Sequence, residues 1–173
     1  MIPFVDLKKQ YFNLKVEIDN AIASVINETA FISGKYANRF ENEFASYLGI
    51  KHVMSCANGT DSLEILLKAF GIGPGDEVIV PANSWISTSE CVSTVGAKVI
   101  FIDSLPNTYT IDTSKIEEKI TSKTKVIIPV HLYGCPADMD EVMFLANKYN
   151  LIVIEDCAQS HGAKYKGKTI GTI

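Results

Sequence analysis

Apolar residues follow two different spacings in the two parts of this chain. Up to residue 49 they recur every three or four positions, which predicts amphipathic helices. We expect one helix over residues 7–25, with its apolar stripe used for packing, and a second over residues 36–48, ending at Gly49. From residue 52 onward, short apolar runs alternate with helical patterns. The expected strands are 52–57, 77–80, 98–103, 125–131 and 151–154, and the expected helices 62–70, 84–94, 112–120 and 140–149.

Strands joined by helices of this length predict a parallel sheet with right-handed crossovers. The sequence contains no internal repeat and no linker-like segment, so we expect one α/β domain. The four aliphatic residues at 151–154 are typical of a strand that is buried on both faces. The strand order is left open by the pattern.

Composition and charge exclude several classes of function. The 173 residues are 47% hydrophobic and 21% charged, with a net charge of −4, which gives no electrostatic reason to expect nucleic acid or an anionic membrane surface. No apolar run reaches the length of a membrane span, and the first residues lack signal-peptide features, so we expect a cytoplasmic protein. The lysines at 164, 166 and 168 are interpreted as a solvated hairpin or loop.

The four cysteines are far apart and form no C-x-x-C pair. We interpret all four as packing residues and expect neither a metal site nor disulfides. They are Cys56, Cys91, Cys135 and Cys157.

A pair of carboxylates, Glu155 and Asp156, follows the last aliphatic run. Side chains alternate along a strand, so these two are expected to point to opposite faces. Open α/β sheets place ligands at the carboxyl ends of their strands, which makes Asp156 a candidate for a site. An equally weighted alternative is that Asp156 caps the following turn by accepting backbone N–H bonds.

A candidate anion site lies at residues 58–61, between an expected strand and an expected helix. Helix N-termini offer free N–H groups and a positive dipole, and Thr60 adds a hydroxyl. On this tetrapeptide alone, an ordinary N-cap is the favoured interpretation. The glycine fingerprints of dinucleotide and nucleoside triphosphate sites are both absent, which disfavours a nicotinamide-binding oxidoreductase domain.

Trp85, the only tryptophan, follows the strand expected at 77–80. A lone tryptophan is more often half-buried packing, but an indole at the ligand edge of a sheet can lie against a flat ring. A phosphate cradle, an aromatic plate and a carboxylate together suit a phosphorylated heteroaromatic ring such as pyridoxal phosphate (PLP). Spacing alone does not name this cofactor.

Five segments, in order and covering most of the chain, carry a resemblance to a known family. The sequence resembles the DegT/DnrJ/EryC1/StrS family of PLP-dependent sugar aminotransferases. The segments are residues 32–49, 57–69, 73–88, 130–140 and 154–163. The resemblance implies the aspartate-aminotransferase-like large domain (PLP fold type I), a mainly parallel sheet flanked by helices. Residues 1–173 would be its N-terminal part, truncated before the small C-terminal domain.

The resemblance also implies roles for individual residues. Gly59 and Thr60 would hold the phosphate, Trp85 would stack on the ring, Asp156 would pair with the ring nitrogen and act in catalysis, and Gln159 would bind the phenolic oxygen. Contacts with the site are also implied, less directly, for three residues, namely Ser33, Gly34 and His161. No chemistry is assigned to His131 or Tyr133, and His131 is expected to be a core histidine bonded to backbone.

The implied activity is transfer of an amino group, from glutamate, to a keto group of a nucleotide-linked deoxysugar, in surface-polysaccharide or related amino-sugar biosynthesis. A homodimer is implied as well. The family's Schiff-base lysine would come after Ile173, and the lysines at 164, 166 and 168 do not match it, so we expect this chain alone to be inactive. The alternatives are a PLP-dependent sugar dehydratase, in which histidine replaces that lysine, and a non-catalytic remnant that binds coenzyme or a partner chain.

Overall fold

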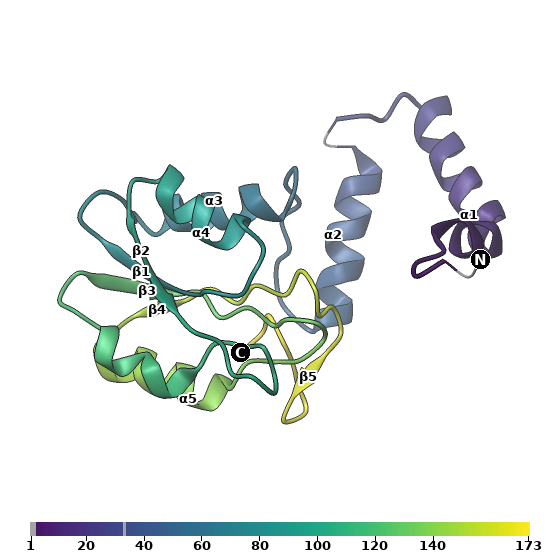
Figure 1. Ribbon diagram of the computed structural model, residues 1–173. Helices are drawn as coiled ribbons and strands as arrows, with labels where there is room; N and C mark the ends of the chain where they lie inside the picture. Colours follow the sequence, from purple (N-terminus) through teal and green to yellow (C-terminus); the bar gives the residue numbers. More distant parts are fainter. Residues whose placement is uncertain (1–2, 33) are drawn as a thin grey trace. The chain divides into compact units, whose positions relative to one another are not determined.

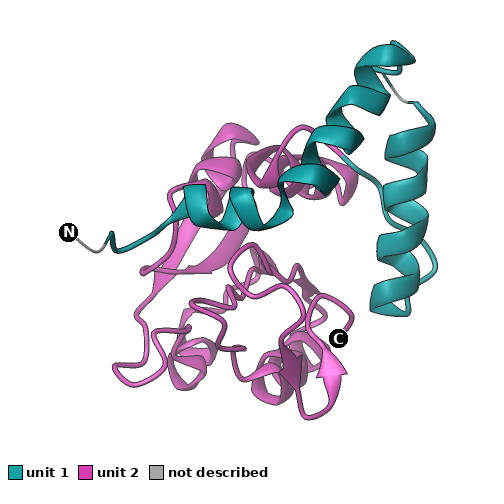
Figure 2. Cartoon of the chain, turned by 90° about the vertical axis from the view of Figure 1, so that its right-hand side faces the viewer, with its two compact units in different colours: residues 1–55 teal, residues 56–173 magenta. Residues whose placement is uncertain are grey.

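The computed structural model describes residues 3–32 and 34–173. It divides into two compact units, residues 1–55 and residues 56–173, which are coloured separately in Figure 2. The sequence indicated one α/β domain without a linker. All the strands among the described residues lie in the second unit.

The first unit contains the two helices that the apolar spacing predicted. α1 (Leu7–Asn27) begins after Asp6, whose side chain accepts the Lys9 N–H at 2.9 Å. α2 (Lys35–Leu48) ends at Gly49, which adopts the left-handed conformation at φ 70°. No residue of α1 is buried, so its apolar stripe is not packed into a core in the way that we expected. Within the described residues, no helix has the length and apolar character needed to cross a membrane.

The second unit is built on a four-stranded parallel sheet with the order β2-β1-β3-β4. The strands are β1 (Glu77–Pro81), β2 (Lys98–Ile102), β3 (Thr124–Ile127) and β4 (Ile152–Val153). Helices α3 (Gly59–Ala69) and α4 (Ser87–Thr94) cover one face of the sheet, and α5 (Met139–Tyr149) covers the other (Figure 1). The predicted α/β class and parallel sheet are confirmed.

Alternation along the central strands divides the core into two layers. Val78 and Val80 of β1 pack with apolar residues of α3 and α4, whereas Ile79 packs with residues of α5. All three are completely buried. Because successive side chains of a strand point to opposite faces, a strand covered on both sides must be apolar throughout, as the run from Val78 to Val80 is.

Several expected elements differ from the structure. Residues 52–57 form no strand; Met54 is 90% exposed, and no neighbouring strand supplies the hydrogen bonds that a strand needs. The helix expected at 112–120 is two 3₁₀ turns, η1 (Thr113–Lys115) and η2 (Glu117–Lys119), although Asp112 caps the first as predicted, by accepting the Ser114 N–H at 3.1 Å.

The last two sheet strands are shorter than expected. β3 ends at Ile127, shortly before Pro129, which has no N–H to donate to a sheet. β4 is the edge strand of the described sheet, and only Ile154 of the run 151–154 is fully buried. Ile152 packs against the core layer beside α3 and α4 and Val153 against the layer beside α5, so both faces of the strand are covered in part, as the run predicted. The predicted lysine-rich hairpin is present as β5 (Lys164–Tyr165) and β6 (Lys168–Thr169).

Candidate functional site

A cavity of about 280 Å³ lies at the carboxyl ends of β1, β3 and β4. The chain leaves β1 toward β2 on one side and leaves β3 toward β4 on the other, so the order reverses between β1 and β3. Such switch points are where open α/β sheets bind ligands. The lining residues are Gly59, Thr60, Leu63, Ser84, Trp85, Ser87, Val130, Leu132, Asp156, Ala158 and Gln159.

The five residues implied to hold the cofactor all line this cavity, although they are up to 100 positions apart in the sequence: Gly59, Thr60, Trp85, Asp156 and Gln159. The three weaker candidates are His161, Gly34 and Ser33. His161 lines an adjoining cavity that shares Gly59 and Asp156 with the first. Gly34 belongs to the first unit, as the N-cap of α2, and its contact with the site stays a prediction. Ser33 lies outside the described residues.

One end of the cavity is formed by the N-terminus of α3. Asn58 is an N-cap, as the simpler interpretation held, because its Oδ1 accepts the Asp61 N–H at 2.9 Å. The N–H groups of Gly59 and Thr60 belong to the first turn, where a helix offers no carbonyl partners. A Cβ added at Gly59 would meet nothing within 4 Å, so space is open beside this backbone. The Thr60 hydroxyl lies 2.6 Å from the Ser87 hydroxyl.

The Asp156 carboxylate also lines the cavity. Its Oδ1 accepts the Ala158 N–H at 3.1 Å, so the predicted turn cap exists. Its Oδ2 lies 3.4 Å from the Thr88 hydroxyl, and the same side chain lines the cavity, so the two interpretations of Asp156 hold together. Glu155 is bonded instead to His131, a residue that does not line this cavity.

Trp85 and Gln159 contribute an aromatic face and an amide. Trp85 is 73% exposed, so the alternative that it is half-buried packing is not supported. Gln159 Oε1 accepts the backbone N–H of Tyr133 at 3.1 Å, which leaves the Nε2 protons available as donors. Tyr133 has a positive φ of 54° within a tight turn closed by the Cys135 N–H to Leu132 carbonyl bond at 2.9 Å. The sequence had suggested no role for this turn, which orients Gln159.

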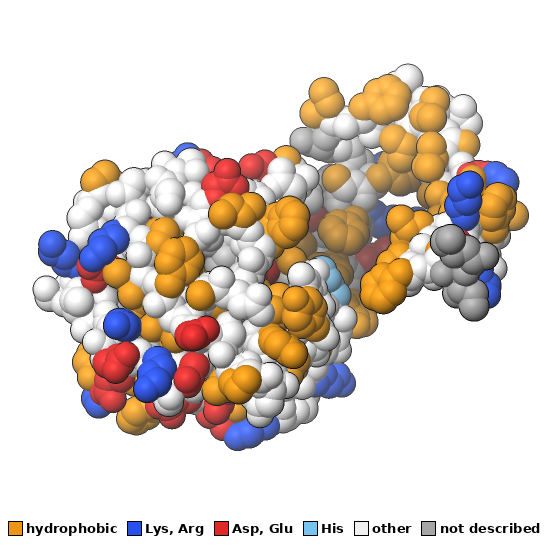
Figure 3. All heavy atoms as spheres, in the orientation of Figure 1, with side chains coloured by type: hydrophobic (Ala, Val, Ile, Leu, Met, Phe, Trp, Pro, Cys, Tyr) orange, Lys and Arg blue, Asp and Glu red, His pale blue; other side chains and the backbone are white. Residues whose placement is uncertain are grey.

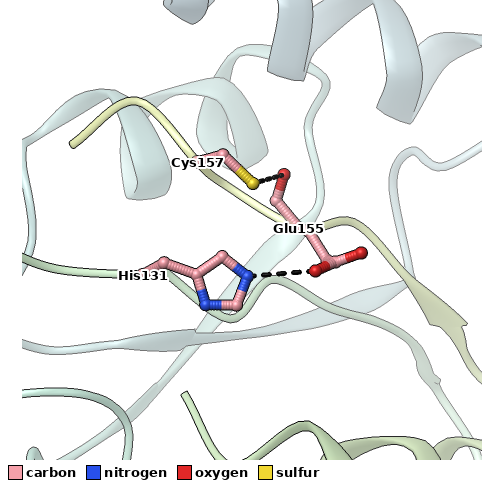
Figure 4. A group of neighbouring side chains, drawn as sticks. All are labelled: His131, Glu155 and Cys157. Carbon is pink, nitrogen blue, oxygen red and sulfur yellow. Dashed lines mark hydrogen bonds and ion pairs between the residues drawn. The ribbon is translucent and has the colours of Figure 1, made fainter. Parts of the chain in front are cut away.

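Glu155 is the centre of a largely buried hydrogen-bond cluster, and Figure 4 shows it with His131 and Cys157. Its carboxylate accepts the N–H groups of Gly171 at 2.8 Å and Ile173 at 2.9 Å, and lies 3.1 Å from His131 Nε2. The Ala137 N–H donates to His131 Nδ1 at 3.0 Å, so the neutral ring carries its proton on Nε2 and donates to Glu155. The expectation of a buried histidine bonded to backbone is therefore confirmed.

The cluster is held together by hydrogen bonds. His131, Glu155 and Cys157 have the donor types and proximity of a metal site. Both nitrogens of His131 are engaged, Nδ1 with the Ala137 N–H and Nε2 with Glu155, and the Glu155 carboxylate also accepts two backbone N–H groups. Burial, together with the charges of Glu155 and Asp156, raises the pKa of the Cys157 thiol to about 12. His131 and Glu155 thus form a hydrogen-bonded support for the strand end that carries Asp156.

The other cysteines differ in their surroundings. Cys91 is fully buried in the core beside α3, and burial raises the pKa of its thiol to about 11. Cys56 is exposed, with its Sγ 2.8 Å from the Ser62 hydroxyl, so the interpretation of Cys56 as a packing residue is wrong. None of the lysines at 164, 166 and 168 lines the cavity, and Lys166 pairs with Asp140.

Three hydroxyl residues near the cavity were missed by sequence reasoning. Ser84 directly precedes Trp85, whereas Ser87 and Thr88 follow it after Ile86 and begin α4. The available signal was the run of serine and threonine residues around the tryptophan. It was overlooked because such residues are common in turns and at helix starts for purely local reasons.

The groups of the cavity suit a phosphorylated pyridine. Backbone N–H groups at a helix N-terminus and a hydroxyl are anion donors, an exposed indole offers a flat face, and a carboxylate can hold a protonated ring nitrogen. The cavity lies near the lower end of the roughly 300–1,000 Å³ range of small-molecule sites. PLP therefore fits the donor set that this chain presents.

The fold and the cavity define an α/β protein with a ligand site at the carboxyl edge of a parallel sheet. The chain belongs to the DegT/DnrJ/EryC1/StrS aminotransferase family, whose model matches residues 13–173.

Individual relatives agree with this membership. The chain is 47% identical over 173 residues to the dTDP-3-amino-3,6-dideoxy-alpha-D-galactopyranose transaminase of Aneurinibacillus thermoaerophilus, covering 100% of this chain and 48% of the relative. Among solved structures, it is similar to S. venezuelae DesV, with 42% identity, a TM-score of 0.95 and coverage of 98% of this chain and 46% of that one.

A third relative bears on the cofactor. The structure of E. coli GDP-4-keto-6-deoxy-D-mannose-3-dehydratase with bound hydrated PLP has 32% identity and a TM-score of 0.83, and the match covers 89% of this chain and 41% of that one. The family and this relative indicate PLP as the cofactor. The chain spans about half the length of the curated relatives it matches.

Proposed function

We propose that this chain is the N-terminal part of the PLP-binding large domain of a cytoplasmic, homodimeric sugar aminotransferase. The reaction would move an amino group from glutamate to a keto group of a nucleotide-linked deoxysugar. The observation that carries the proposal is the meeting, at one cavity, of five separated residues whose chemical groups suit the cofactor: Gly59, Thr60, Trp85, Asp156 and Gln159. The Aneurinibacillus relative is named for a dTDP-linked deoxysugar, which supports a nucleotide-linked deoxysugar as the substrate class.

Each of these residues has a distinct task in the proposal. When bound, PLP supplies an electron sink for the carbon that loses a proton. Asp156 holds a proton on the ring nitrogen, and the Gln159 amide donates to the phenolic oxygen. The first turn of α3 binds the phosphate through Gly59 and Thr60, and Trp85 covers one face of the ring and excludes water from it.

Binding can be tested with the single tryptophan as the reporter. We expect pyridoxamine phosphate to quench Trp85 fluorescence in a saturable, one-to-one titration, because the indole would lie on the ring. Asp156→Asn and Thr60→Val each remove a charged or charge-assisted contact, so each should weaken binding by about 10- to 100-fold, from ~1.5–3 kcal/mol per bond. Ser93→Ala, on the exposed part of α4, is the matched control. A titration without saturation would contradict the proposed site.

The reaction can be tested with ¹⁵N-labelled glutamate and a dTDP-linked keto-deoxysugar, using the full-length enzyme that would contain this chain, because we expect the chain alone to be inactive. Mass spectrometry should find ¹⁵N in the sugar product. Because the E. coli relative is a dehydratase, dehydration of the sugar is the second candidate reaction. Its product would have lost a hydroxyl group and would contain no ¹⁵N. Binding of the cofactor without either product would favour a non-catalytic, coenzyme-binding protein instead.

A further inference from the structure

We infer that the first turn of α4 positions both ends of the bound cofactor through two adjacent hydroxyls. Ser87 would hold Thr60 at the phosphate end, and Thr88 would hold Asp156 at the ring-nitrogen end. This inference rests on the proposed function and assigns positioning roles to two residues outside the five already described.

Ser87 is placed to orient the phosphate contact. It is 8% exposed, lines the cavity, and lies with its Oγ 2.6 Å from Thr60 Oγ1. Each hydroxyl has one proton. If Ser87 donates to Thr60, the proton of Thr60 is free to point at a phosphate oxygen, and the chain of two bonds strengthens that donor. Without Ser87, the Thr60 hydroxyl would lose its fixed direction.

Thr88 is placed to orient the carboxylate. It is 1% exposed, and its hydroxyl donates to Asp156 Oδ2 over 3.4 Å, a long bond that can shorten when a ligand closes the site. Since its proton is directed at Asp156, Thr88 accepts the bond from the Ser84 hydroxyl at 2.9 Å. The Ala158 N–H holds the other carboxylate oxygen. Both oxygens of Asp156 therefore have a donor, which fixes the plane of the carboxylate.

The rest of α4 keeps this turn in place. One helical turn further on, Cys91 and Val92 are fully buried in the core that α4 shares with α3. Consecutive residues on a helix point about 100° apart, so Ser87 and Thr88 can serve different partners without competing. The packing of α4 therefore fixes the positions of the two hydroxyls.

Crossed double-mutant cycles test the two assignments separately. The Kd of pyridoxamine phosphate would be measured by calorimetry for Ser87→Ala and Thr88→Val, each in the wild-type, Thr60→Val and Asp156→Asn backgrounds. Ser87→Ala should weaken binding by about tenfold in wild-type and in Asp156→Asn, but have little effect in Thr60→Val. Thr88→Val should weaken binding by about fivefold, and its effect should vanish only in Asp156→Asn.

Matched controls come from the same helix. Ser93→Ala and Thr94→Val remove exposed hydroxyls that bond only to backbone carbonyls of α4, and should leave the Kd unchanged. Thr88→Ser retains the hydroxyl and should restore most of the affinity lost in Thr88→Val, which a purely packing role would not predict. If wild-type protein fails to bind pyridoxamine phosphate, the proposed function fails. If it binds, and the two variants behave like the controls or lose the same affinity in every background, this inference alone is overturned.

Discussion

At the scale of residues, the two neighbouring carboxylates have separate tasks. Asp156 lines the cavity, whereas Glu155 binds His131 and the backbone of Gly171 and Ile173. The alternation of side chains along an extended chain makes this division possible within two positions. Glu155 therefore supports the strand end from which Asp156 reaches the cavity.

Glu155→Gln should lower the free energy of unfolding by ~1–3 kcal/mol at pH 7. A glutamine keeps the shape but has only one acceptor oxygen, so its NH₂ group would face an N–H donor inside a buried cluster. Urea-induced unfolding provides the measurement. Glu118→Gln is the control, because that side chain is 59% exposed and paired only at the surface, so its effect should stay within about 0.5 kcal/mol.

The difference in stability between wild-type protein and Glu155→Gln should depend on pH. Burial opposes ionisation of Glu155, but the hydrogen bonds from His131, Gly171 and Ile173 outweigh it and hold the pKa of this carboxyl below its ordinary value of 4.5. A lowered pKa means that the stabilisation is complete above pH 4.5 and is lost as the pH falls through the folded-state pKa. The difference between wild-type and Glu155→Gln should therefore shrink on acidification below about pH 4.5. A difference that stays constant from pH 7 to pH 3 would contradict this account.

At the scale of elements, the spacing of apolar residues and the capping residues predicted the helices and the central strand, which depend mainly on local interactions. The helices α1, α2 and α5 and the central strand β1 follow directly from the spacing of apolar residues and from caps such as Asp138, which accepts the Glu141 N–H. The strand order and the position of β4 at an edge depend on long-range pairing, which no local pattern contains. The 52–57 segment has strand-like residues, but it lacks a neighbouring strand.

The candidate site was predictable to a similar degree. Each of its five principal residues follows a strand or begins a helix, so its position at the sheet edge could be inferred, and the resemblance supplied the roles. Contacts between side chains of different elements, such as Ser87 with Thr60 or Gln159 with the Tyr133 backbone, were not predictable because they depend on how α4 and the 132–135 turn are oriented.

Asn58, the N-cap of α3, directly precedes the site residues Gly59 and Thr60. Asn58→Ala should lower the free energy of unfolding by ~1 kcal/mol, because the Asp61 N–H loses its acceptor, while Asn58→Ser should keep most of the stability. The control Asn147→Ala, at an exposed position inside α5, should be neutral or slightly stabilising. The affinity for pyridoxamine phosphate should fall with Asn58→Ala, because the cap orients the turn that carries Gly59 and Thr60. Equal stability of Asn58→Ala and wild-type would contradict the assigned cap.

At the scale of the whole molecule, the two units differ in how their apolar residues are used. The second unit buries a core on both faces of its sheet, whereas α1 buries no residue. Large apolar side chains of α1 are more than half exposed, and Figure 3 shows exposed apolar groups on the surface. These side chains, which we call the α1 apolar surface, are Leu7, Phe12, Val16, Ile22 and Ile26. Extended exposed apolar surface is typical of interaction sites.

We therefore expect the protein to self-associate through the α1 apolar surface, in agreement with the proposed homodimer. Multi-angle light scattering at micromolar concentration should give at least twice the monomer mass. Phe12 and Val16 are four residues apart and are therefore neighbours on the helix surface. Replacing both with glutamine, a good helix former, should keep the helix but lower the measured mass toward that of the monomer. The control is Phe144→Gln, which replaces an exposed aromatic residue of α5 outside the α1 apolar surface and should leave the mass unchanged. A wild-type protein that stays monomeric would refute self-association, and an oligomer that the double variant does not weaken would place the contact on another surface.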